Sequence, residues 1–164
     1  MTVLSSFRHT GLVVRDVNKA QAFYAALGFT EVARDIESGY FIEQVTGFED
    51  AKLEWVKLTL DGGILLELLQ YHTPGNHELT PEPHPKFAGN YPPDSYPTNM
   101  HGCSHVAYTT PDIDACCDKI LAAGGSLVNP PAPSPNGKVK VAYAYDLDGI
   151  LMEIVEELGE SESG

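Results

Sequence analysis

Residues 8–29 read RHTGLVVRDVNKAQAFYAALGF, and residues 104–125 repeat their pattern as SHVAYTTPDIDACCDKILAAGG. In each copy an apolar run follows a histidine, an aspartate stands seven positions after that histidine, and a glycine stands nineteen positions after it. Aspartate is a favoured helix N-cap and glycine a favoured helix terminator, so each copy predicts a strand followed by a helix. Agreement at all three offsets indicates an internal repeat.

A second pair of matching segments lies downstream, GILLEL at 63–68 and GILMEI at 149–154, each with a glutamate four residues after a glycine. Apolar and alternating runs predict further strands at 30–36 and 53–60 in the first copy, and at 126–128 and 138–146 in the second. Each copy therefore predicts a βαβββ module. The first copy has an additional segment, in which YFIEQVTG is expected to form a short helix or a mobile flap.

These patterns predict an α+β fold built from two paired βαβββ modules. The expected boundaries are 5–71 for the first module, 72–102 for a Pro-rich linker or lid loop, 103–157 for the second module and 158–164 for a disordered acidic tail. The linker lacks either periodicity, and long loops inside compact domains are often functional.

Composition excludes several classes of partner. The 164 residues carry a formal net charge of -13, which argues against a nucleic-acid partner. No apolar stretch approaches the roughly 20 residues that span a bilayer, and the start of the chain does not resemble a signal peptide, so no membrane association is expected. Three cysteines without a CxxC spacing fit a reducing compartment, and we expect a cytoplasmic protein.

The glutamates of the two matched segments stand on apolar strands. Alternate residues of a strand share a face, so Glu67 lies among leucines, where an isolated carboxylate is costly. Pairing the two modules about a pseudo-twofold axis would bring His9, Glu67, His105 and Glu153 near one point. Two imidazoles and two carboxylates suit one divalent ion such as Ni, Zn, Co, Mn or Fe(II), with open positions for water and substrate.

Each of these four residues also has an ordinary interpretation that involves no metal. A single strand histidine or glutamate is usually a satisfied core or surface residue, and only the repeated register favours a metal site. We interpret four further histidines as exposed residues of the linker, namely His72, His77, His84 and His101. Cys103 is expected to pack rather than to act as a nucleophile, because no base stands at a fixed spacing from it.

With these residues in place, the chain resembles the vicinal oxygen chelate superfamily. This superfamily includes glyoxalase I, methylmalonyl-CoA epimerase, extradiol dioxygenases, and the fosfomycin and bleomycin resistance proteins. The resemblance rests on the twin modules, on FYAALGF at 23–29, on DLDGILMEIVE at 146–156 and on the His/Glu/His/Glu order. It implies a curled mixed sheet, formed by the paired modules, around a metal-binding cleft. It also implies His9, Glu67, His105 and Glu153 as metal ligands, and a homodimer.

The segment VTGFEDAK at 45–52 looks like the glyoxalase I and methylmalonyl-CoA epimerase branch. Epimerases often carry glutamine at the second ligand position, so Glu67 is more similar to glyoxalase I. The resemblance implies a lyase or isomerase that acts on a small molecule and moves a proton next to a carbonyl through a metal-stabilised enediolate, with Glu153 or Glu67 as base.

Two other functions stay open at this point. His9, His105 and Glu153 alone would form the two-His-one-carboxylate triad of an extradiol-type Fe(II) dioxygenase. The cleft could also bind a small molecule without catalysis, as in a resistance protein. The basic residues that could bind an anionic substrate are as often solvated surface charges, and they are Arg8, Arg15, Arg34, Lys57, Lys138 and Lys140.

Overall fold

The computed structural model describes residues 8–46, 49–61, 63–72 and 105–159. The chain divides into two compact units, residues 1–77 and 78–164, and each is described by itself. The expected linker lies outside the described residues except for His72, and so does the expected acidic tail from residue 160 onward. None of the helices in the described ranges is long and apolar enough to cross a membrane.

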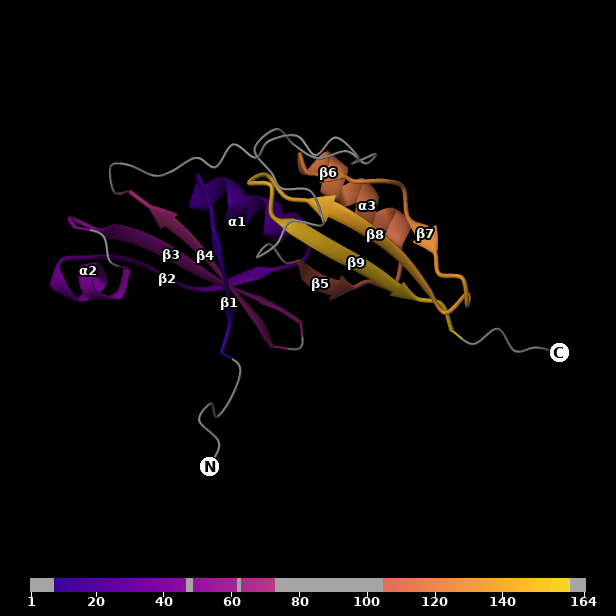
Figure 1. The fold of residues 1–164 in the computed structure, drawn as a ribbon, viewed down its shortest axis with the longest axis horizontal. Coiled ribbons are helices and arrows are strands. Elements are labelled where there is room, and N and C mark those ends of the chain that lie inside the picture. Colours follow the sequence, from indigo (N-terminus) through magenta and orange to yellow (C-terminus); the bar gives the residue numbers. More distant parts are fainter. Residues whose placement is uncertain (1–7, 47–48, 62, 73–104, 160–164) are drawn as a thin grey trace, which may run out of the picture. The chain divides into compact units, whose positions relative to one another are not determined.

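The first unit is a four-stranded mixed sheet with two helices (Figure 1). The strand order is β1-β4-β3-β2, in which β1 runs parallel to β4 and the other pairs are antiparallel. The elements along the chain are β1 (Thr10–Val13), α1 (Val17–Ala26), β2 (Thr30–Ser38), α2 (Tyr40–Thr46), β3 (Lys52–Leu60) and β4 (Ile64–Tyr71).

The second unit repeats this plan. Its strand order is β5-β9-β8-β6, with β5 parallel to β9 and a short β7 also paired with β8. The elements are β5 (Val106–Thr109), α3 (Ile113–Ala122), β6 (Ser126–Leu127), β7 (Ala132–Pro133), β8 (Val139–Tyr145) and β9 (Leu151–Glu157). The α+β prediction of two βαβββ modules is confirmed, and the difference is the additional strand β7, which forms inside the Pro-rich segment NPPAPSPNG at 129–137.

The helix boundaries follow from the repeated aspartates and glycines. The Asp16 carboxylate accepts hydrogen bonds from the amides of Asn18 and Lys19, and the Asp112 carboxylate accepts one from the amide of Ala115. These bonds satisfy amides that a helix leaves without an intrahelical partner at its start. After α1 the chain turns at Gly28 with φ of 105°, a left-handed conformation that favours glycine.

One face of the first sheet is covered by α1. Leu66 and Leu68 of β4 are fully buried, and Gln70 lies on the same face two residues further along. The Gln70 side-chain oxygen accepts a hydrogen bond of 2.9 Å from the amide of Val17, the first residue of α1. Because successive side chains of a strand point to opposite faces, Glu67 projects from the face that α1 does not cover.

The second sheet has the same arrangement. Ile154 of β9 is 1% exposed, and Glu156 on its face accepts a hydrogen bond of 3.1 Å from the amide of Ile113, the first residue of α3. Glu153 therefore projects from the face opposite α3.

The segment expected to be a helix or a flap forms the helix α2. Ile42 of α2 is buried with Ala51 and Leu53, and Leu69 of β4 packs against this small cluster. Leu69 shares a face with Glu67, so α2 packs on one end of the face from which Glu67 projects.

Candidate functional site

In the first unit, strand pairing brings His9 and Glu67 together. The parallel register of β1 and β4 sets Gly11 opposite Glu67, and His9 lies two residues before Gly11. His9 Nε2 is 3.0 Å from Glu67 Oε2. Gly11 suits this crowded position, because a Cβ atom there would meet Leu69 Cδ1 at 3.2 Å.

In the second unit, the same pairing brings His105 and Glu153 together. Ala107 lies opposite Glu153 in the parallel pair β5–β9, and His105 Nε2 is 3.1 Å from Glu153 Oε2. The Tyr143 ring of β8 lies 5.5 Å from the His105 ring. Burial is the larger cause, and the negative charge of Glu153 the smaller cause, of a raised pKa of Tyr143. This phenol therefore stays neutral at physiological pH.

Each pair supplies one imidazole and one carboxylate, which is half of the predicted set of metal ligands. Zinc-like ions hold imidazole nitrogen and carboxylate oxygen at about 2 Å, so two donors to one ion lie roughly 3 Å apart. Both observed N–O separations fit this value. In the described part of either unit, no group of three or more His, Cys, Asp or Glu side chains could hold a metal. The meeting of all four predicted ligands at one ion stays a prediction, since the two units are described separately.

Glu67 has a second partner that the sequence analysis missed. Lys57 of β3 lies opposite Glu67, and its Nζ is 3.4 Å from Glu67 Oε1. The Lys57 ammonium also lies 4.3 Å from the centre of the Trp55 ring. The signal was present in the hairpin: Leu60 pairs with Ile64, so the antiparallel register places Lys57 and Glu67 at equal distances from the turn.

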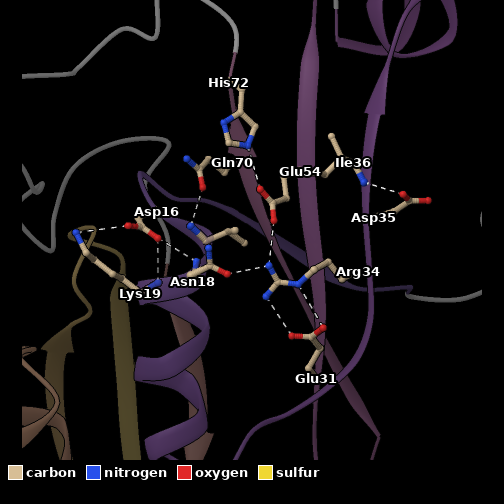
Figure 2. Close-up of polar contacts among 11 residues, drawn as sticks. Asp16, Asn18, Lys19, Glu31, Arg34, Asp35, Ile36, Glu54, Gln70 and His72 are labelled. Atoms are coloured by element: carbon tan, nitrogen blue, oxygen red, sulfur yellow. Dashed lines mark hydrogen bonds and ion pairs between the residues drawn. The ribbon is translucent and has the colours of Figure 1, made fainter.

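A separate polar network lies at the start of α1 (Figure 2). Arg34 of β2 donates to both carboxylate oxygens of Glu31, to Glu54 Oε1 at 3.0 Å and to Asn18 Oδ1 at 2.9 Å. His72 Nε2 lies 3.0 Å from Glu54 Oε2. The carboxylates of Glu31, and then of Glu54, raise the pKa of Arg34.

This network belongs to the helix-covered side of the sheet. Glu54 lies opposite Gln70, which contacts the first residue of α1. Arg34 is thus committed to carboxylates away from Glu67, and its expected role as one candidate for binding an anionic substrate is not supported by its contacts. His72, expected to be an exposed linker histidine, is exposed and also contacts Glu54.

The described cysteines do not resemble nucleophiles. Burial raises the pKa of Cys116, and burial with neighbouring negative charge raises the pKa of Cys117 to about 11. Both are therefore thiols at neutral pH. Cys103, His77, His84 and His101 lie outside the described residues.

The chain is similar in sequence and in structure to several known proteins. A lactoylglutathione lyase from Pseudomonas aeruginosa is 31% identical over 166 aligned residues, which cover 96% of this chain and 86% of that protein. A solved glyoxalase family protein from Bacillus cereus has a TM-score of 0.78 at 24% identity, covering 96% of this chain and 97% of that one. Glyoxalase I from Zea mays has a TM-score of 0.56 at 19% identity, covering 92% of this chain and 46% of the maize chain.

The two structural likenesses support the fold that the strand pairing shows. The family described as the glyoxalase/bleomycin resistance protein/dioxygenase superfamily matches residues 6–154, a range that includes both His–Glu pairs. The chain therefore belongs to the glyoxalase/bleomycin resistance protein/dioxygenase superfamily.

Proposed function

We propose that the protein is a divalent-metal-dependent lyase or isomerase of the glyoxalase I type. The observation that carries this proposal is the presence of the same His–Glu pair, with N–O separations of 3.0 and 3.1 Å, on the face of each sheet that α1 or α3 does not cover. The name of the P. aeruginosa relative, lactoylglutathione lyase, supports the same reaction class.

The donor set fits a divalent ion. His9 and His105 would each supply one ring nitrogen, and Glu67 and Glu153 would each supply carboxylate oxygen. When bound, such an ion supplies Lewis acidity that polarises a substrate carbonyl. The two carboxylates then hold and move protons: one takes the proton from the carbon next to the carbonyl, and the proton returns to the neighbouring carbon. The reaction is a proton relocation without net oxidation, so no further redox partner is needed.

The proposed substrate has oxygen atoms on two adjacent carbons, and the thiohemiacetal of glutathione with a 2-oxoaldehyde is our first candidate. The lyase or isomerase is favoured over the Fe(II) dioxygenase by Glu67. A triad of His9, His105 and Glu153 would leave Glu67 without a function, yet Glu67 contacts His9 as closely as Glu153 contacts His105.

Metal analysis combined with solvent deuterium exchange tests this function. Protein expressed with zinc or nickel supplementation is expected to carry about one divalent ion per chain. In deuterium oxide it should exchange the proton next to the carbonyl of the glutathione–methylglyoxal thiohemiacetal. A 2-methylacyl-CoA thioester serves as the comparison substrate for epimerase activity.

Protein that carries the metal but exchanges neither substrate would contradict the proposed reaction. Oxygen consumption with a catechol by the Fe(II)-loaded protein would establish the dioxygenase instead. Failure to take up any divalent ion would favour a binding protein.

A further inference from the structure

We infer that Lys57 is the anion-binding residue of the site and stabilises negative charge that develops on the substrate oxygens. This inference rests on the proposed function and assigns the substrate class more closely. The site would favour ligands with adjacent anionic oxygens, such as an enediolate or a dicarboxylate. Four points support it: the contact between Lys57 and Glu67, the restraint of the Lys57 ammonium, the net charge expected for the metal-loaded site, and the difference between the two units.

The first observation is where Lys57 lies. Its Nζ is 3.4 Å from Glu67 Oε1, while Glu67 Oε2 faces His9 at 3.0 Å. The ammonium therefore stands beside a proposed ligand, on the oxygen that does not contact the imidazole. A substrate oxygen next to Glu67 would be within reach of the same ammonium.

The second observation is that two groups restrain the ammonium. The Trp55 ring, two residues earlier on the same face of β3, lies 4.3 Å from Lys57 Nζ, and Glu67 holds it from β4. The Lys57 side chain is 26% exposed, so it is not a solvated surface lysine. A restrained cation costs little to reorganise when negative charge develops near it.

The third point is a charge count that follows from the proposed function. A divalent ion held by Glu67 and Glu153 would be neutralised by these two carboxylates, with His9 and His105 as neutral imidazole ligands. Lys57 would then leave the loaded site with one uncompensated positive charge. In a partly buried site such a charge favours an anionic ligand over a neutral one of the same shape.

The fourth observation is that the positive charge is not part of the repeat. Tyr143 stands opposite Glu153 in β8, at the position where Lys57 stands opposite Glu67 in β3. Within the described residues of the second unit, the ion pair of Glu153 is with His105 and includes no lysine or arginine. Duplication alone therefore does not account for Lys57.

The alternative is that Lys57 only neutralises Glu67. Both roles predict that removal of the positive charge leaves zinc binding intact or makes it tighter, because repulsion between Lys57 and the ion is lost. The two roles differ for anions. A neutralising residue would leave the affinity for oxalate unchanged, whereas an anion-binding residue would not.

The experiment measures zinc affinity, and then oxalate affinity of the zinc-loaded protein, by calorimetry. Oxalate is a planar dianion with oxygens on adjacent carbons. Lys57→Met keeps the aliphatic stem and should weaken oxalate binding by roughly 10- to 100-fold, the effect of one charged hydrogen bond. Lys57→Arg should retain most of the oxalate affinity. Lys57→Tyr introduces the residue of the second unit at the equivalent position, and it gives the same readout if the methionine variant does not fold.

Lys140→Met is the matched control. Lys140 is also a half-buried strand lysine paired with a carboxylate, that of Asp114, and it is 24% exposed. It lies opposite Glu156, on the helix-covered face of its sheet, so its loss should leave oxalate affinity unchanged.

Equal oxalate affinity in wild type, Lys57→Met and Lys57→Tyr would overturn the role of Lys57 alone. Wild-type protein that binds zinc and oxalate but lacks exchange activity would overturn the proposed reaction and leave the role of Lys57 intact. Wild-type protein that binds no zinc would overturn both.

Discussion

The two units build the same helix–sheet junction with different charges. In the first unit, Asn18, Glu54 and Gln70 surround the start of α1. The corresponding positions around α3 in the second unit carry Asp114, Lys140 and Glu156. Glu54 on β3 of the first unit corresponds to Lys140 on β8 of the second unit, so an acid is replaced by a base. Asn18 on α1 corresponds to Asp114 on α3, so a neutral residue is replaced by an acid. The same backbone geometry therefore forms with opposite arrangements of charge.

The His–Glu pair shows no such exchange. His9 with Glu67 and His105 with Glu153 have the same residue types, the same strand register and nearly the same separation. The helix–sheet junction needs only hydrogen-bond partners for its polar groups, and several combinations of side chains can provide them. A metal ion, in contrast, is bound by only a few residue types. The contrast separates residues that maintain the fold from residues that the proposed chemistry requires.

The largest expected effect comes from removing either carboxylate. Glu67→Gln and Glu153→Gln should each lower kcat/KM for the thiohemiacetal by about 100-fold or more, since general acid–base catalysis by one group contributes about 10²–10⁴-fold. The two effects should be of similar size if the units contribute equally. Steady-state kinetics with metal content measured in parallel checks this. Glu157→Gln, at the exposed end of β9, is the control.

If both glutamine variants kept their metal and full activity, neither glutamate would be a ligand or a base. If only one variant lost activity, that glutamate would be the base and its counterpart dispensable.

A smaller effect is expected from two matched core residues. Leu68 and Ile154 each follow the site glutamate by one residue and are 0% and 1% exposed. Leu68→Ala and Ile154→Ala should each lower the free energy of unfolding by about 2–5 kcal/mol, because each leaves a cavity. Urea denaturation measures the loss. Val13→Ala provides a control, since Val13 is 61% exposed.

A loss below 1 kcal/mol at only one of these positions would show that the two cores are packed unequally, despite the equal burial of these side chains.

The smallest effect concerns the helix caps. Asp16 accepts two amide hydrogen bonds and Asp112 accepts one, so Asp16→Ala should lower the melting temperature more than Asp112→Ala. The hydrogen bond from the Lys19 amide lowers the pKa of Asp16 below its ordinary value of 3.8.

A lowered pKa means that ionised Asp16 stabilises the folded state above about pH 4, and that this contribution is lost as the pH falls through the folded-state pKa. The melting temperatures of wild type and Asp16→Ala should therefore converge between pH 6 and pH 3. A constant difference over this range would exclude the carboxylate as the cause.

Much of the fold could be predicted because its signals are local. Asp16, Asp112, Gly28 and Gly124 set the helix boundaries through bonds and angles within a few residues, and the structure confirms them. The pairing of each histidine with its glutamate depends instead on the parallel registers of β1 with β4 and of β5 with β9, which strand periodicity does not specify.

The charge partners could not be predicted from alternation alone. A regular strand would place Glu31 and Arg34 on opposite faces, but a register shift between Glu31 and Ala33 brings them onto one side. The Lys57–Glu67 contact depends on the register of a hairpin rather than on any local motif. Such contacts arise from tertiary geometry, which the order of residues specifies only indirectly.

The position of β1 has a further consequence for the local unfolding of the first sheet. β1 is a strand of four residues at the edge of its sheet, and its neighbour in the described residues is β4. His9 comes just before β1, and Glu67 stands on β4. An ion held by both would join the edge strand to the sheet by a ligand bond as well as by backbone hydrogen bonds. Fraying of β1 and release of the ion would then be one event, and amide hydrogen exchange in β1 would report metal occupancy.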